Sequence, residues 1–112
     1  MLDAAAYGRV FKKATRSQDK WFTVLCRDND GGVARLGLAI SKKHCRAASG
    51  RNRIKRIVRE SFRHHQAILG GLDVVVMNQP AARSGDNRQL IDSLHDHWQR
   101  CEKARTNRDE QE

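Results

Sequence analysis

The 112-residue sequence has no long apolar run, a single proline, three cysteines and six aromatic residues. No segment approaches the ~18 consecutive apolar residues of a membrane-spanning helix, and no signal-peptide pattern opens the chain. The length accommodates one domain, which excludes a multidomain enzyme or a TIM barrel. We therefore expect one soluble cytoplasmic domain with no membrane partner over residues 1–104, and a disordered polar tail over 105–112.

The sequence also lacks the residue clusters that metal binding or catalysis requires. Its cysteines are widely spaced and include no C-x-x-C pair, which predicts free thiols rather than disulfides or a zinc knuckle. His95 and His97 point away from each other on a helix, and the adjacent pair His64–His65 has no partner at ligand spacing. No Ser-His-Asp or Cys-His pattern is visible, so we expect no catalytic residue and no metal held by the protein. The expected free thiols are Cys26, Cys45 and Cys101.

The first half of the sequence predicts a helix and two strands. Asp3 is a suitable N-cap for a helix over residues 4–13. Residues 21–27 are rich in aromatic and β-branched side chains, and residues 35–41 alternate apolar with small or polar ones, as strands do. The Asp- and Gly-rich turn at 28–32 predicts that these two strands form an antiparallel hairpin.

The second half predicts a helix over residues 51–69, ended by Gly70, and then a buried strand over 72–77. That strand is nearly continuously apolar, which predicts a central position in the sheet. Asp86 and Gln89 form a capping-box pattern before a last helix. The expected apolar stripe of this helix is Leu90, Ile91, Leu94, Trp98 and Cys101. The order α-β-β-α-β-α predicts an α+β domain with helices packed on a small sheet.

The net charge of +9 is concentrated in one segment. The window from Lys42 to Arg63 has nine basic residues and one acid, Glu60, so its charge is +8 and the rest of the chain is nearly neutral. Like charges at i, i+4 destabilise a helix, and a solvated face usually mixes signs, so we favour phosphate binding over solvation. The polar stripe of the predicted helix is Asn52, Arg56, Arg59 and Arg63. Its predicted apolar side is Ile54, Ile57, Val58, Phe62 and Ile68.

Two of the six aromatic residues, Tyr7 and Phe11, lie one turn apart on the first predicted helix. Spacing alone favours a core role for both. The alternative is a platform on which unpaired bases stack, next to the positive charges of Lys12 and Lys13.

The segment Arg51–Arg63, which begins R-N-R-I-K-R, resembles the R-N-R helix of the bacterial ribonuclease P protein subunit. The preceding L-G-L-A-I-S-K-K, residues 36–43, resembles the strand and paired lysines of that family, and Tyr7–Lys12 resembles its aromatic N-terminal helix. The resemblance spans residues 3–101. It implies an αβββαβα order, a mainly antiparallel sheet and a left-handed β-α-β crossover, a fold shared with a ribosomal protein domain. Sequence rules alone predict a right-handed crossover.

The resemblance also implies a function. The family protein forms a 1:1 ribonucleoprotein with a catalytic RNA, without an obligate protein partner, and assists removal of the 5′ leader from precursor tRNA. The RNA performs the hydrolysis with Mg²⁺ held mainly by the RNA and the substrate. The residues implied for contact with the catalytic RNA are Lys42, Lys43, Arg46, Arg51, Asn52, Arg53, Lys55, Arg56, Arg59 and Arg63. The residues implied for a cleft that takes the single-stranded leader are Tyr7, Phe11 and Lys12.

Two other functions remain alternatives. A ribosomal or general RNA-binding protein of similar fold would use the same basic helix to dock on ribosomal RNA. An enzyme with a metal site built from Asp28, Asp30 and histidines is the second alternative, although an ordinary turn role explains the two aspartates.

Overall fold

The computed structural model describes the backbone of residues 2–111 and the side chains of residues 2–105. The helices are α1 (Ala4–Lys12), α2 (Ala48–His64) and α3 (Asn87–Gln111), and a 3-10 helix, η1 (Pro80–Arg83), precedes α3. The strands are β1 (Thr15–Gln18), β2 (Phe22–Asp28), β3 (Arg35–Ala39) and β4 (Leu72–Asn78). The α+β class and the αβββαβα order are therefore confirmed. No helix in the described part of the chain is long and apolar enough to cross a membrane.

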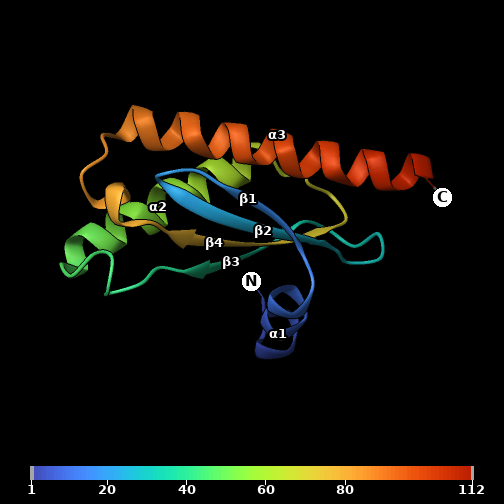
Figure 1. The fold of residues 1–112 in the computed structure, drawn as a ribbon, viewed down its shortest axis with the longest axis horizontal. Helices are drawn as coiled ribbons and strands as arrows, with labels where there is room; N and C mark the ends of the chain where they lie inside the picture. The colour runs from blue at the N-terminus through green and yellow to red at the C-terminus, as the bar shows by residue number, and fades with distance from the viewer. Residues whose placement is uncertain (1, 112) are drawn as a thin grey trace.

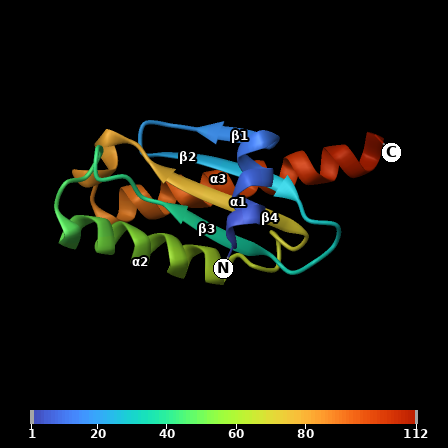
Figure 2. The same ribbon diagram turned by 90° about the horizontal axis from the view of Figure 1, so that it is seen from below.

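The four strands form one mixed sheet in the order β1-β2-β4-β3, seen face-on in Figure 2. β2 pairs antiparallel with both β1 and β4, whereas β3 pairs parallel with β4. The predicted central position of β4 is confirmed, because β4 lies between β2 and β3. Its residues Val74, Val75 and Val76 are all fully buried. A strand that is apolar on both faces is most stable when another strand and a packed layer cover each of its sides.

The predicted antiparallel hairpin of residues 21–27 and 35–41 is wrong. β4 inserts between β2 and β3, so that Val24 pairs with Val76 on one side and Leu38 pairs with Val76 on the other. The antiparallel partner that β2 has on its other side is β1, which the periodicity analysis missed. β1 has the sequence T-R-S-Q and buries only Ser17, so it carries no apolar alternation.

β3, α2 and β4 form a parallel β-α-β unit with a left-handed connection. In Figure 2, β3 and β4 point the same way and α1 lies in front of the sheet, while α2 runs back on the opposite face. Most connections of this type are right-handed, because strand twist favours that hand. The hand implied by the family resemblance is therefore confirmed against the general rule.

The sheet separates two apolar clusters. α2 and α3 cover one face and α1 crosses the other, as Figure 1 shows. On the larger side Trp98 of α3 meets Phe62 of α2 edge-to-face, with ring centroids 6.0 Å apart, and its Nε1–H donates to Ser61 Oγ at 2.8 Å. On the smaller side Val10 of α1 packs on Val75 of β4. A strand covered on both faces by these clusters is the rigid centre of the domain.

Local sequence signals set most helix ends correctly. Asp3 caps α1 by accepting the Ala6 N–H at 2.8 Å, and Asp86 and Gln89 form the predicted capping box, with reciprocal bonds of 3.0 and 2.8 Å. α2 ends at His64 rather than at residue 69, because residues 65–71 form successive turns. α3 continues to Gln111, through much of the segment expected as a disordered tail (105–112), and Arg, Glu and Gln there are good helix formers.

The apolar sides of α2 and α3 follow the predicted stripes with two exceptions. Ile68 lies beyond the end of α2 and is half-buried. Ile91 is 46% exposed, because the side of α3 that faces the sheet is rotated so that His97 enters the interior instead. The predicted stripe residues that are buried are Ile54, Ile57, Val58 and Phe62 on α2 and Leu90, Leu94, Trp98 and Cys101 on α3.

A buried polar network joins β1 to α3. His97 is fully buried, and its Nδ1 lies 2.7 Å from Ser17 Oγ while its Nε2 lies 3.2 Å from Asp19 Oδ2. Ser93 donates to Asp19 Oδ2 at 2.5 Å, and Arg100 donates to Ser17 Oγ at 3.1 Å. The order of groups resembles a Ser-His-Asp catalytic triad, but a serine that is 7% exposed beside a fully buried histidine offers no access to a substrate. The network therefore has a structural role, which is to hold the edge strand β1 against α3.

We expect the stability of the protein to fall in mild acid because of this network. Burial lowers the pKa of His97 from 6.5, aided by the Arg100 charge and opposed by Asp19 and Asp96. The unfolded chain therefore binds a proton at a higher pH than the folded protein. The free energy of unfolding should decrease as the pH drops below about 6.5, by at most about 1.4 kcal/mol per pH unit.

Urea unfolding between about pH 5 and pH 7.5 would measure this effect against the variant His97→Gln. The pKa of Asp19 is lowered from 3.8, because hydrogen bonds to its carboxylate outweigh the opposing effect of burial, so Asp19 titrates below this range. The variant should be less stable at neutral pH but should show the smaller pH slope. Equal slopes in the two proteins would contradict the assignment to His97.

Candidate nucleic-acid interface

α2 separates its side chains into a buried apolar side and an exposed basic side, as the helical wheel predicts. The exposed stripe is Asn52, Arg56, Arg59 and Arg63. Glu60, the one acid of the segment, is also exposed. Among the described residues, none of the three guanidinium groups of this stripe takes part in an ion pair or an intramolecular hydrogen bond. The stripe therefore carries positive charge with unused hydrogen-bond donors, which suits phosphate groups.

The segment between β3 and α2 brings three more basic residues to the start of this face. Lys42, Lys43 and Arg46 are all exposed. The chain is fixed there by Asn78, whose Oδ1 accepts the Ser41 N–H at 2.7 Å, and by the Ser41 hydroxyl, which accepts the Lys43 N–H at 3.0 Å. α2 also begins without a side-chain cap and without an acid in its first turn, so its N-terminal N–H groups add to the positive potential.

Arg51 makes hydrogen bonds within the protein. Its Nη1 donates to the carbonyl oxygens of Cys45 at 3.0 Å and of Arg46 at 2.6 Å. The segment before α2 is thereby closed against the first turn of the helix. Arg51 therefore fixes the backbone at Cys45 and Arg46, in addition to the RNA contact that the family resemblance implies for it.

Arg53 acts in the same way at the other side of α2. Its Nη2 donates to the Gly85 carbonyl at 2.6 Å, and its Nε donates to Asn87 Oδ1 at 3.0 Å. These bonds tie the segment between β4 and α3 to α2. Gly85 is itself tightly enclosed, because a Cβ there would lie 2.9 Å from side-chain atoms of Leu90 and Trp21. Of the predicted RNA-contact residues, Arg51 and Arg53 therefore have an observed internal role.

We expect Arg53 and Arg56 to differ in their effects on stability. Arg53→Ala should lower the free energy of unfolding by about 1–2 kcal/mol, because it leaves the Gly85 carbonyl and the Asn87 side chain without their charged partner. Arg56→Ala removes only an exposed, unbonded group and should change it by less than about 0.5 kcal/mol. Urea unfolding of the two variants measures the difference. An unchanged stability in Arg53→Ala would show that its internal bonds contribute nothing.

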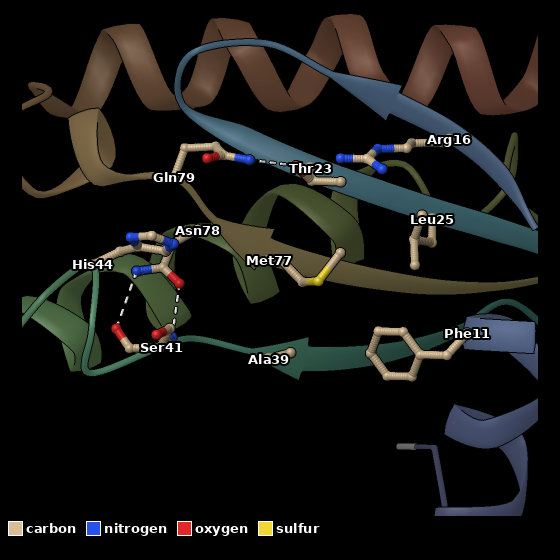
Figure 3. A pocket seen from close by; sticks show the side chains of 10 residues that line it. All are labelled: Phe11, Arg16, Thr23, Leu25, Ala39, Ser41, His44, Met77, Asn78 and Gln79. Carbon is tan, nitrogen blue, oxygen red and sulfur yellow. Dashed lines mark hydrogen bonds between the residues drawn. The ribbon is translucent and has the colours of Figure 1, made fainter.

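The opposite face of the sheet carries a second surface, a cavity of about 480 Å³ beside α1. Figure 3 shows the Phe11 ring projecting from α1 beside β3, with Ser41, His44 and Asn78 at the far end of the cavity. Strand residues supply an apolar floor and polar groups line the rim. The lining residues are Phe11, Arg16, Thr23, Leu25, Ala39, Ser41, His44, Met77, Asn78 and Gln79.

Tyr7 and Phe11 stack on each other but have different surroundings. Their ring centroids are 6.3 Å apart with an angle of 16° between the planes. The Tyr7 hydroxyl accepts the Leu38 N–H at 2.9 Å, and its ring lies so close to Gly37 that a Cβ there would be 2.7 Å away. Phe11 is 53% exposed. Tyr7 thus anchors α1 to β3, whereas Phe11 presents an open aromatic face.

The other predicted cleft residue, Lys12, is exposed at the end of α1 but does not line the cavity, and neither does Tyr7. Most lining residues were missing from the sequence-based set. Arg16, Thr23, Leu25 and Met77 come from three different strands, and only the strand order brings them together. No local pattern in the sequence marks them.

Asp28 and Asp30 have an ordinary turn geometry. The Asp28 carboxylate accepts the Asp30 N–H at 2.7 Å, and Asp30 has a positive φ of 64°. Within the part of the chain that the structure describes, no three His, Cys, Asp or Glu residues are grouped so that they could hold a metal ion.

The three cysteines are buried and reduced, and contact with the Cys26 thiol, together with burial, raises the pKa of Cys101.

The fold and these two surfaces define a small α+β protein with an exposed basic helix on one face of its sheet and an open cavity on the other. A model of the ribonuclease P family matches residues 1–102. The chain is 53% identical over 94 residues to the ribonuclease P protein component of Thioalkalivibrio sulfidiphilus, covering 84% of this chain and 78% of that protein. It is 42% identical over 98 residues to the protein component of Nitrosococcus oceani, covering 88% and 82% of the two chains.

Solved structures of RNase P proteins have the same fold as this chain. The Staphylococcus aureus RNase P protein superimposes with a TM-score of 0.77 at 30% identity, covering 85% of this chain and 87% of that one. The Thermotoga maritima RNase P protein gives a TM-score of 0.75 at 29% identity, with coverages of 84% and 89%. The chain belongs to the ribonuclease P protein component family. This membership implies a role in tRNA processing and a partnership with the ribonuclease P RNA.

Proposed function

We propose that the chain binds the catalytic RNA of ribonuclease P through the exposed side of α2 and assists removal of the 5′ leader from precursor tRNA. The observation that carries this proposal is the unpaired basic stripe of α2. The residues that we assign to direct RNA contact are Lys42, Lys43, Arg46, Asn52, Lys55, Arg56, Arg59 and Arg63. Arg51 and Arg53 are assigned a positioning role, because their guanidinium groups bond to neighbouring segments.

The chemistry of the stripe supports an RNA partner over simple solvation. Arg56, Arg59 and Arg63 repel one another along α2, which weakens the isolated helix. Burial of Ile54, Val58 and Phe62 on the other side compensates for this repulsion in the folded protein. Guanidinium groups form paired hydrogen bonds with phosphate oxygens, so an RNA backbone would neutralise the stripe. In this proposal hydrolysis, with its Mg²⁺, belongs to the RNA and the substrate.

We further propose that the cavity beside α1 takes the single-stranded leader. The exposed face of Phe11 offers a stacking surface for one base, and Arg16 in the lining supplies positive charge for phosphates. Lys12, exposed at the end of α1 outside the lining, adds a second positive charge nearby. Polar groups at the rim include Gln79, whose Nε2 donates to Thr23 Oγ1 at 2.6 Å. Stacking tolerates every base, so this surface suits leaders of varied sequence.

A reconstitution assay tests the first part of the proposal. The purified protein should restore leader cleavage by ribonuclease P RNA at low Mg²⁺ and should not cleave precursor tRNA without that RNA. Arg56→Ala combined with Arg59→Ala should weaken RNA binding and reduce the slope of log K against log salt by about 0.7–0.9 for each lost phosphate contact.

Arg88→Ala is the matched control, because Arg88 is an exposed arginine of α3 outside the basic stripe. It should leave the salt slope unchanged. An unchanged slope in the α2 variant would mean that the stripe is only solvated. Failure to stimulate the RNA, together with binding to ribosomal RNA, would favour the alternative of a ribosomal RNA-binding protein.

Phe11→Ala tests the leader site separately. Because Phe11 is largely exposed, the fold should be retained, and loss of one stacked base should weaken precursor tRNA binding by about 1–3 kcal/mol. Binding of mature tRNA, which has no leader, should change little. Filter binding of the reconstituted complex to both RNAs measures this. Equal losses for both would indicate that Phe11 has a structural role.

We also propose a 1:1 complex with the RNA, no obligate protein partner, and a cytoplasmic location. One continuous basic side on one helix supports a single RNA-docking surface per chain. The buried thiols of Cys26, Cys45 and Cys101 suit a reducing compartment.

A further inference from the structure

Two histidines that are far apart in the sequence meet where the end of α2 passes α3. His65 Nε2 lies 3.2 Å from His95 Nδ1, and the two rings have centroids 5.3 Å apart with 65° between their planes. The residues are separated by 30 positions, so an inspection of ligand spacing along the chain does not find them. Spacing along the sequence therefore does not reveal that His65 has His95 as a neighbour.

A hydrogen bond selects the tautomer of the neutral His65 ring. Its Nδ1 lies 2.7 Å from the Ser61 carbonyl oxygen, which only accepts hydrogen bonds, so Nδ1 carries the proton. Nε2 then keeps its lone pair and accepts the Nδ1–H of His95. Histidines that bind metals usually donate their other ring N–H to such an oxygen, which orients the ring and raises its basicity.

The separation of the two nitrogen atoms also fits a shared metal ion. Two imidazole nitrogens at the usual zinc distance of about 2.0–2.1 Å, placed at a tetrahedral angle, lie about 3.3 Å apart. The observed 3.2 Å is close to this value. His95 is exposed, so its ring can turn until both lone pairs point to one ion, and its Nδ1 proton can move to Nε2. Binding then needs no net loss of protons.

We propose that His65 and His95 form a two-histidine site for a divalent transition-metal ion such as Zn²⁺, Ni²⁺ or Co²⁺. Two imidazole nitrogens from the protein and water molecules would complete the coordination, because the described residues supply no third close ligand. A neighbouring groove of about 410 Å³, lined in part by Arg56, Glu60 and His65, leaves room for these waters. The charges of Glu60 and Arg56 balance there, so the two imidazole nitrogens carry the proposal. Mg²⁺ prefers oxygen ligands and is excluded on chemical grounds.

The bound ion would connect the end of α2 to the middle of α3. These helices already pack on the same face of the sheet (Figure 1), so the ion would bind the folded state and not the unfolded chain. A ligand with this preference raises the unfolding temperature, and the rise grows with the logarithm of the free ligand concentration once that exceeds Kd. The site lies at the groove between the two helices, apart from the cavity beside α1.

The test is a titration of the untagged, reduced protein with NiCl₂, followed by calorimetry and by ¹H–¹⁵N NMR of the histidine side chains. We expect one ion per chain and early paramagnetic broadening confined to His65, His95 and their neighbours. His65→Asn and His95→Asn should each weaken Ni²⁺ binding at least tenfold. His44→Asn, which removes a histidine at the sheet cavity, should leave the affinity within about twofold, and MgCl₂ should cause no broadening.

Equal broadening of all five histidines, or an unchanged affinity in both His65→Asn and His95→Asn, would overturn the proposal. Thermal unfolding without metal checks that each variant is folded. Because His95 is exposed, its substitution should disturb the fold less than substitution of the half-buried His65. A rise in the unfolding temperature with Ni²⁺ in the unmodified protein, absent in His95→Asn, is the second expected result. None of these measurements uses RNA, so the proposal and the proposed function fail or succeed independently.

Discussion

The pairing of β4 with β2 on one side and β3 on the other is the constraint on which both proposed RNA-binding surfaces depend. Val74 and Val76 pack under α2 and α3, whereas Val75 packs under α1, so a single strand fixes the helices of both faces. The basic side of α2 and the cavity beside α1 therefore lie on opposite faces of one rigid sheet. A protein built in this way can contact two segments of RNA at a fixed separation without a hinge.

The basic helix illustrates how function and stability divide among neighbouring residues of the same type. Arg56, Arg59 and Arg63 are exposed and unbonded, and they weaken α2 by mutual repulsion. Arg51 donates a hydrogen bond to a carbonyl oxygen of the segment before the helix, and Arg53 donates to one in the segment that precedes α3. The repulsive stripe is tolerated because the apolar side of α2 is fully packed and because two arginines bond the helix to its surroundings.

Local rules predicted the features that depend on neighbours in the sequence: the Asp3 cap, the Asp86–Gln89 capping box and the buried side of α2. They failed where partners are distant. β1 has no apolar pattern, because its stability comes from pairing with β2 and from the Ser17–His97 contact across 80 residues. The predicted hairpin of β2 and β3 was wrong for the same reason. The turn between these strands does not reveal that the more apolar β4 inserts between them.

Tyr7 and Phe11 show why spacing could not decide between a core and a binding role. Both lie on the same side of α1, one turn apart, yet the Tyr7 hydroxyl is bonded to β3 and its ring is accommodated only because residue 37 is glycine. Phe11 stacks on Tyr7 but lies outside the apolar cluster between α1 and the sheet, and it remains 53% exposed. The half-buried ring of Tyr7 stacks on the exposed ring of Phe11 and holds its orientation. An aromatic face that is rigid and unburied loses little conformational entropy on binding, so the apolar surface left uncovered by folding is available to a stacked base.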